Sequence, residues 1–398
     1  MEFSWWLVLL AGFAGWCIGY EKLRHSLSNL PRILTRNPGS DLSTLLPDHN
    51  DQVERDLELN NLLEQYAVDD NSVELYLTLG DAFRRRGEYS RAIAVHEHLL
   101  SRGHLSDDQQ RKVKLEMARD YAGAGLLDRV EALLKPLVKD NPEDAASQAS
   151  LLRLYEKQQE WEDAIELASV STSMAAGERA ARKAQYYCEL AVIAELEDNL
   201  PAMEKWLQRA LKSEPHCSRA LVMLGRYCIE LKQYREAISN FEQIEEHHPE
   251  LVPEIAQSWF FALHEVDDEE ALRKHLEYVR GRQNSYSVIK LARDAISKLE
   301  GEAKASEFFI EQLAKRPSLR GLRDWAEFEL KLIKTEDREK VAAVVDMLRD
   351  VTDEKPVYLC NRCGYRCKQI QWLCPGCENW NSVKVIIGAE GELSLIHI

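Results

Sequence analysis

The 398-residue sequence lacks the motifs that mark most enzymes. It contains no nucleophile elbow, no glycine-rich phosphate-binding loop and no zincin helix motif. The segment His96-Glu97-His98 comes nearest to a catalytic cluster. We predict that it is an ordinary helix surface, because side chains two positions apart on a helix point in different directions. These absences argue against catalysis, and we expect a protein that is not an enzyme.

An excess of positive charge is also missing. The chain has 51 Lys and Arg residues against 67 Asp and Glu residues, which gives a formal net charge of −16 at pH 7. Nonspecific binding to nucleic acid needs a basic face that neutralises phosphates. We therefore expect no nucleic-acid partner. An acidic body instead favours solubility and repulsion from anionic lipid.

Charge of either sign is absent between Phe3 and Tyr20. As a helix this segment would be about 27 Å long, at the short end of what crosses a bilayer. The alternative is a cleaved signal peptide, but no basic residue precedes the segment and no A-x-A site follows it. We predict an uncleaved transmembrane anchor at residues 1–20.

The charges that follow the anchor predict its orientation. They are mostly basic, with only Glu21 against Lys22, Arg24, Arg32 and Arg36. By the positive-inside rule we predict a single-pass membrane protein whose body after Tyr20 lies in the cytoplasm and whose N-terminus lies across the membrane, in the periplasm. Gly15 and Gly19 form a small-x3-small pair that would suit a homodimer of anchors, although Gly is also common in membrane helices generally.

The middle of the chain repeats with a period near 34 residues. Each unit has an anchor position, and twelve residues later a second one; successive first anchors lie 38, 34, 39, 34, 34 and 34 residues apart, at Gly80, Ala118, Leu152, Ala191, Gly225, Trp259 and Arg293. This is the period of the tetratricopeptide repeat, a pair of helices. Small anchors let the two helices approach closely, whereas Leu152, Trp259 and Arg293 depend on the spacing alone. Stacked units predict an all-α superhelical solenoid with a concave groove.

Prolines and composition divide the chain further. Several units close with a proline, which cannot continue a helix: Pro142, Pro215, Pro249 and Pro317. Residues 21–50 are rich in Pro, Ser and Asn and predict a linker. We assign 51–352 to the solenoid, in which 51–67 is half of an irregular first repeat and Trp325 to Leu348 a capping helix pair. Residues 353–398 form a separate small module.

That module contains two C-x2-C pairs, Cys360 with Cys363 and, after ten intervening residues, Cys374 with Cys377. Two such pairs place four thiolates around one tetrahedral metal ion and leave no open position, so we predict a structural metal. Four thiolates suit zinc, and also iron as in rubredoxins. Each pair should form a tight turn whose backbone N–H groups point at sulfur, with Gly364 and Gly376 providing the unusual backbone angles.

The other cysteines and the aromatics of the module receive structural roles. We expect Cys188, Cys217 and Cys228 to be small buried hydrophobes. Cys367 lies between the two pairs, and we expect it to pack or face solvent because the pairs already complete the site. Four aromatics should shield the metal or dock the module onto the repeats: Tyr358, Tyr365, Trp372 and Trp380.

The order of these parts resembles the lipopolysaccharide assembly protein B family of Gram-negative bacteria. The stretches that carry the resemblance are Leu77-Thr-Leu-Gly80, Arg86-Gly-Glu88, Arg91-Ala-Ile93, Tyr187-Cys-Glu-Leu190 and Trp372-x-Cys374-Pro-x-Cys377. The resemblance runs from about residue 71 to residue 388. Residues 25–70 are richer in Pro than that family's first repeat, and the tail from Leu393 to Ile398 has no counterpart.

The resemblance implies a noncatalytic inner-membrane adaptor that regulates lipopolysaccharide biosynthesis. Its partners would be the membrane AAA+ protease FtsH, the deacetylase that commits precursor to lipid A, and a membrane sensor of lipopolysaccharide level. The adaptor would promote degradation of the deacetylase by the protease. Two alternatives stay open: a redox or electron-transfer protein with iron at the four cysteines, and a general assembly scaffold for envelope complexes.

Overall fold

The computed structural model describes residues 72–386 with gaps, together with Asn61 and Leu63. The gaps are 103–104, 172–173, 267–269, 271–272, 274–275, 277–285, 316, 333–337 and 354. The chain divides into two compact units, residues 1–109 and 110–398. The predicted anchor and linker lie outside the described residues. Within the described part, no helix has both the length and the apolar character needed to cross a membrane.

In the first unit, helices α3 (Val73–Arg85) and α4 (Tyr89–Arg102) pack as one antiparallel pair. Gly80 lies where the two helices meet, and a Cβ atom there would lie 2.3 Å from the imidazole of His96. His96 is fully buried, so the prediction of an ordinary helix surface is wrong for this residue. Its ring fills the space that the glycine leaves open.

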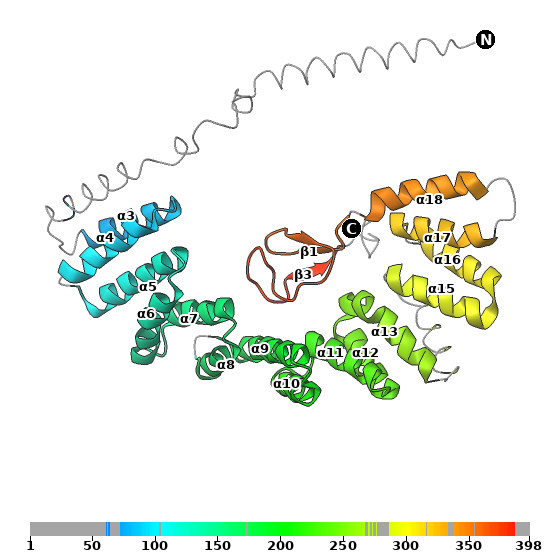
Figure 1. The fold of residues 1–398 in the computed structure, drawn as a ribbon, viewed down its shortest axis with the longest axis horizontal. Coiled ribbons are helices and arrows are strands. Elements are labelled where there is room, and N and C mark those ends of the chain that lie inside the picture. The colour runs from blue at the N-terminus through cyan, green and yellow to red at the C-terminus, as the bar shows by residue number, and fades with distance from the viewer. Residues whose placement is uncertain are drawn as a thin grey trace, which may run out of the picture. The chain divides into compact units, whose positions relative to one another are not determined.

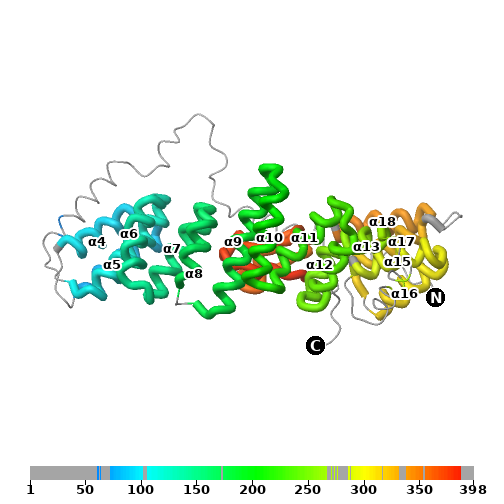
Figure 2. The backbone as a smooth tube through the Cα atoms, turned by 90° about the horizontal axis from the view of Figure 1, so that it is seen from below, coloured from blue at the N-terminus to red at the C-terminus, as the bar shows by residue number. Residues whose placement is uncertain are grey.

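In the second unit, the helices again follow one another in pairs (Figure 1). The pairs are α5 (Asp107–Gly123) with α6 (Leu127–Asp140), α7 (Ala145–Gln158) with α8 (Trp161–Val170), α9 (Ala176–Leu196) with α10 (Leu200–Ser213), and α11 (Ser218–Glu230) with α12 (Tyr234–His247). A 3₁₀ turn, η2 (Pro249–Leu251), and α13 (Val252–Glu265) come next, followed by α15 (Tyr286–Glu300) with α16 (Glu302–Lys315) and α17 (Leu319–Leu332) with α18 (Arg338–Asp353). Neighbouring pairs pack on each other, as α9 to α12 do in Figure 2.

The predicted anchor positions are the buried contacts between these helices. Ala118, Ala164, Ala191, Ala237 and Ala305 are each at most 2% exposed. A Cβ atom on Gly225 would lie 2.3 Å from the Phe241 ring, which explains the glycine. The larger anchors are buried as well: Leu152 at 1%, Trp259 at 2% and Arg293 at 6% exposure. The repeat spacing therefore predicts the buried positions correctly even where the residue is not small.

Helix ends and buried cysteines also match the sequence expectations. Four helices end two residues before a proline, namely α6, α10, α12 and α16 before Pro142, Pro215, Pro249 and Pro317. The proline ring disfavours helical backbone angles at the residue before it, and proline itself lacks the N–H that a further helical turn would need. Cys188, Cys217 and Cys228 are all buried, the first two with their Sγ atoms 4.0 Å apart. The last helix pair, α17 and α18, is longer at both ends than the predicted capping pair.

A small antiparallel sheet follows the last helix. Its strands are β1 (Tyr358–Cys360), β2 (Arg366–Cys367) and β3 (Val383–Val385), in the order β2-β1-β3. Tyr358 pairs with Cys367 on one side and with Val385 on the other. The apolar core of this module is small, and two of its buried members are cysteines: Tyr358, Cys360, Cys374, Val383 and Val385. So small an apolar core is typical of modules that depend on a metal for stability.

Candidate metal centre and its docking surface

The structure brings the four predicted cysteines together. The Sγ atoms of Cys360, Cys363, Cys374 and Cys377 all lie within 4.8 Å of one another. The Cys360 to Cys377 separation is 3.7 Å and the Cys363 to Cys374 separation is 3.6 Å. Four sulfurs at about 2.3 Å from a tetrahedral zinc ion would be ~3.8 Å apart. The sulfur positions therefore fit a closed four-thiolate site.

The first turn of the site follows strand β1. The Arg362 backbone N–H donates to Cys360 Sγ at 3.4 Å, as expected for a metal-binding turn. The Gly364 N–H donates to the Cys360 carbonyl at 3.0 Å, and Gly364 has a φ of +77°. A residue with a Cβ atom would be strained at this φ, so glycine is favoured there. The chain can then return as β2.

The second turn uses its glycine differently from the prediction. The left-handed position is Glu378, with a φ of +52°, and its N–H donates to the Cys374 carbonyl at 2.8 Å. Gly376 instead permits close packing, since a Cβ atom on it would lie 3.2 Å from Cys363 Sγ. A side chain at position 376 would thus press on a cysteine of the other turn.

The electrostatics of the four thiols favour a bound cation. The Ser382 hydroxyl lies 3.4 Å from Cys360 Sγ and lowers the pKa of that thiol to about 5. At Cys363 the backbone N–H of Tyr365 favours the thiolate, but desolvation and the neighbouring Cys374 and Cys360 outweigh it and raise its pKa to about 12. Like charges this close oppose one another's ionisation. A divalent cation would remove that opposition and hold all four sulfurs as thiolates.

Cys367 is not part of the cluster. It lies on β2, half-buried against the small core of the module. Burial raises the pKa of its thiol, and the nearby Cys374 and Cys360 act in the same direction. This is the packing role that the sequence predicted.

Trp380 docks the module onto helices α7 to α9. Its indole N–H donates to Glu156 Oε1 at 2.9 Å, and Glu156 also accepts from the Tyr186 hydroxyl at 2.6 Å. The indole meets the rings of Trp161 and Tyr186 edge to face, at centroid distances of 6.3 and 6.1 Å. Burial beside this carboxylate raises the pKa of Tyr186. The Glu156 side chain is only 9% exposed, so its two donors replace most of its water.

A second set of contacts joins the module to η2 and α13. The Tyr358 hydroxyl donates to Glu254 Oε2 at 2.9 Å, and Lys384 Nζ donates to Glu250 Oε1 at 3.2 Å. Ile370 and Trp372 pack against the apolar core of helices α11 to α13. Three of the four predicted aromatics therefore dock the module, whereas Tyr365 is 38% exposed.

The acceptors of this docking surface were missed by the sequence analysis. Glu156, Glu250 and Glu254 are ordinary acidic residues of the repeats, in a chain with 67 acidic residues. Glu156 and Trp380 are separated by 224 positions. Neither the repeat period nor the cysteine spacing relates positions so far apart, and no sequence signal distinguishes these carboxylates from their neighbours.

The family models that match this chain agree with its repeat architecture. The tetratricopeptide repeat family matches residues 115–187 and 218–246. The chain is 26% identical to lipopolysaccharide assembly protein B of Escherichia coli (strain K12), over 98% of this chain and 100% of that protein. It is 28% identical to the protein of the same name from Haemophilus influenzae, over 98% and 99%. Among solved structures, MamA from Desulfovibrio magneticus RS-1 matches at 17% identity and a TM-score of 0.30, covering 45% of this chain and 96% of that one.

Proposed function

Because the chain is a homologue of lipopolysaccharide assembly protein B along nearly its whole length, we propose that it is a noncatalytic adaptor in lipopolysaccharide assembly. The observation that carries this proposal is that the similarity includes the anchor region, the repeats and the cysteine module together. Repeats of this kind present extended surfaces for other proteins. These homologues confirm the predicted family resemblance. Their name supports a general role in lipopolysaccharide assembly, which is less specific than the adaptor role that the resemblance implied.

The finer proposal concerns proteolysis at the membrane. The chain would hold the lipid A-committing deacetylase near the protease FtsH and respond to a membrane sensor of lipopolysaccharide level. A tether at residues 1–20 would raise the effective concentration of client at the protease to the order of mM without any new contact. The body of the chain would then lie on the cytoplasmic face of the inner membrane.

Affinity capture from crosslinked membranes tests this proposal. The full chain should retain both the protease and the deacetylase. In a strain deleted for the protein, the full chain should restore deacetylase turnover, while a chain without residues 1–20 should restore it poorly. Full restoration by the anchorless chain would refute tethering. A deacetylase level that does not change on deletion would favour a general assembly scaffold instead.

We also propose that Cys360, Cys363, Cys374 and Cys377 hold one structural metal ion, zinc or iron. Its support is the pair of sulfur separations of 3.7 and 3.6 Å. When bound, the metal would supply folding free energy to a module with a small core. Metal analysis of the purified chain distinguishes the two metals. A colourless protein with one equivalent of zinc would exclude the redox alternative, whereas a red protein with thiolate-to-iron absorption would support it.

The docking contacts suggest how the module would serve an adaptor. It binds helices α7 to α9 through Trp380 and the η2–α13 segment through Tyr358 and Lys384. Solenoid units otherwise contact only their neighbours, so their relative positions are soft over long distances. A module that binds two separated parts of the solenoid would restrict that bending and preform a surface for partners.

A further inference from the structure

The second unit contains a cavity of about 530 Å³ at the junction of helices α13, α15 and α17 with the cysteine module. Five cationic side chains line it: Lys290, Arg320, Arg323, Lys355 and Lys368. Among the lining residues that the structure describes, Asp324 is the single carboxylate. The cavity therefore has four positive charges in excess, within a chain whose net charge is −16.

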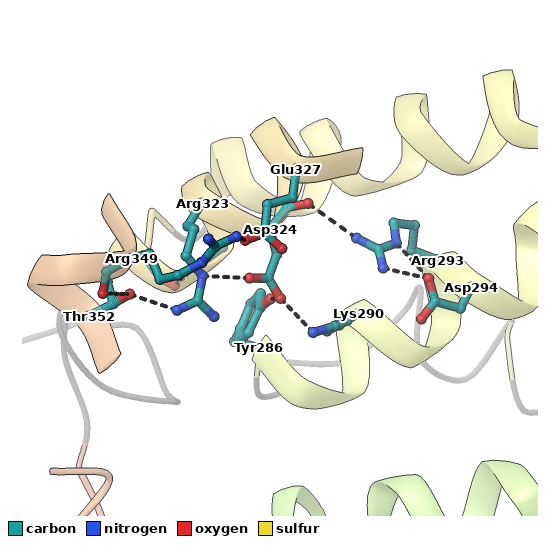
Figure 3. A network of polar contacts seen from close by, with 11 residues as sticks. Tyr286, Lys290, Arg293, Asp294, Arg323, Asp324, Glu327, Arg349 and Thr352 are labelled. Carbon is teal, nitrogen blue, oxygen red and sulfur yellow. Dashed lines mark hydrogen bonds and ion pairs between the residues drawn. The ribbon is translucent and has the colours of Figure 1, made fainter. Parts of the chain in front are cut away.

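A buried carboxylate organises part of this charge (Figure 3). Asp324 is 3% exposed; it pairs with Lys290 Nζ at 2.7 Å and with Arg323 Nε at 2.8 Å, and it accepts a hydrogen bond from the Tyr286 hydroxyl. Arg323 also donates to Thr352 Oγ1 at 2.7 Å. These contacts hold the two cations in fixed positions at the cavity wall. Preorganised donors of this kind lose little entropy when they bind an anion.

The remaining cations come from different elements. Arg320 lies on α17 and donates to the Lys355 carbonyl at 3.1 Å, which connects it to the segment entering the module. Lys368 belongs to the module itself and is exposed. Asp324 neutralises only one of the two cations that it pairs with. The positive charge that remains is therefore contributed by both the helices and the module. An anion with two or more charges is the complementary ligand.

We propose that this cavity binds the phosphate group of a phosphorylated small molecule. A phosphate ester carries close to two negative charges and several acceptor oxygens, which suits a site with both Arg and Lys donors. A ligand with a single carboxylate would leave most of the positive charge of the cavity lining uncompensated. Apolar residues also line the cavity and would contact the organic part of the ligand: Pro253, Ala256, Leu291 and Val357. The volume is within the range of small-molecule sites.

The position of the cavity gives the ligand a regulatory consequence. Val357 and Lys368 come from the module, whereas Lys290, Arg320 and Arg323 come from the helices. A ligand that contacts both sides stabilises the docked arrangement relative to an undocked one by mass action. The ligand would thus act as an effector of module docking, and its chemistry is independent of which protein client the adaptor holds.

Calorimetric titration of the purified, metal-loaded full chain in detergent tests the proposal, with inorganic pyrophosphate and glucose 1-phosphate as probes. Binding should be detected, and the variants Lys368→Glu and Arg320→Gln should each weaken it about tenfold or more, because each loses a charged contact. Lys298→Glu is the matched control, since Lys298 is exposed on α15 outside the cavity lining. Far-UV circular dichroism checks that each variant keeps its helices.

Other probes separate the sources of the phosphate. Stronger binding of glucose 1-phosphate supports a soluble metabolite, and stronger binding of dioctanoyl phosphatidic acid supports a lipid headgroup; both outcomes support the phosphate site. The proposal is overturned if no phosphate probe binds. It is also overturned if the control variant weakens binding as much as Lys368→Glu does, or if citrate or a glutamate-rich peptide binds as tightly as the phosphates.

Discussion

Replacing Trp380 with Ala should release the cysteine module from helices α7 to α9 without unfolding those helices. The indole contributes one hydrogen bond to the Glu156 carboxylate and two edge-to-face ring contacts. It contacts helices α7 to α9, whereas the Tyr358 hydroxyl contacts Glu254 on α13. The variant therefore removes one of the two attachments and leaves the other in place.

The magnitude follows from these contacts. A hydrogen bond to a charged group contributes about 1.5–3 kcal/mol, and each aromatic pair about 0.5–1.5 kcal/mol. Trp380 is half-buried and these contributions are not additive, so we expect a loss of about 3 kcal/mol in docking free energy. Since 1.4 kcal/mol is a factor of ten, the undocked population should rise about a hundredfold. Trp380→Phe keeps the ring contacts and should lose only the hydrogen bond, about half of this amount.

Native-state hydrogen exchange measures the undocked population directly. Amides at the contact, on α8 and α9 and around Trp380, should exchange about a hundredfold faster in Trp380→Ala, whereas helices α5 and α6 should be unaffected. Tyr365→Ala is the matched control, because Tyr365 is an aromatic of the same module that is 38% exposed. Unchanged exchange in Trp380→Ala, or an equal effect of the control, would refute the docking role.

Replacing Cys374 and Cys377 together with Ser should abolish metal binding and unfold the module while the repeats stay helical. On the proposed function, the variant should also stop client degradation, and a metal-free variant with normal client turnover would show that the module is dispensable. Gly225→Ala should lower the free energy of unfolding by about 1–3 kcal/mol, because its Cβ atom would meet a buried ring at 2.3 Å; Gly177→Ala, with no atom within 4 Å of the added Cβ, is the control in urea unfolding. Burial alone would raise the pKa of Asp324, but the bonds from Lys290 and Tyr286 outweigh it and lower the pKa below its ordinary value of 3.8. The ionised carboxylate therefore stabilises the fold above pH 3.8, and this stability is lost as the pH falls through the lower folded pKa. Asp324→Asn should be less stable than wild type at pH 7 and lose that disadvantage below the folded pKa, and a disadvantage that does not depend on pH would contradict this account.

Much of the architecture could be read from the sequence because it is periodic or local. The 34-residue spacing located the helix contacts even at Arg293, whose guanidinium lies over the rings of Phe309 and Phe328, 4.8 and 4.9 Å from their centroids. Repeats permit this because each unit is packed by its own two helices and its neighbours. The four cysteines could be predicted for a similar reason: two short turns, each set by a spacing of three positions, are enough to bring the sulfurs together.

Two predictions about individual residues were wrong, although both concerned local features of the chain. Gly376 was expected to supply a left-handed backbone angle, but it makes room for Cys363 Sγ, while Glu378 takes the positive φ. His96 was expected on a surface, but its ring is buried against Gly80. In both cases the deciding neighbour lies across a contact, on the other turn or the other helix, where sequence spacing carries no information.

The tertiary structure alone decided where the module docks and which charged side chains meet at the junction. Trp380 meets Glu156 across 224 positions, and the cationic cavity joins residues of α15 and α17, which belong to successive repeats, to module residues that no repeat period relates to them. Periodicity predicts contacts inside a unit and between adjacent units, because those contacts recur. A contact made once, between a repeat and a non-repeating module, depends on the shapes and charges of two completed surfaces, and it exists only after both have folded.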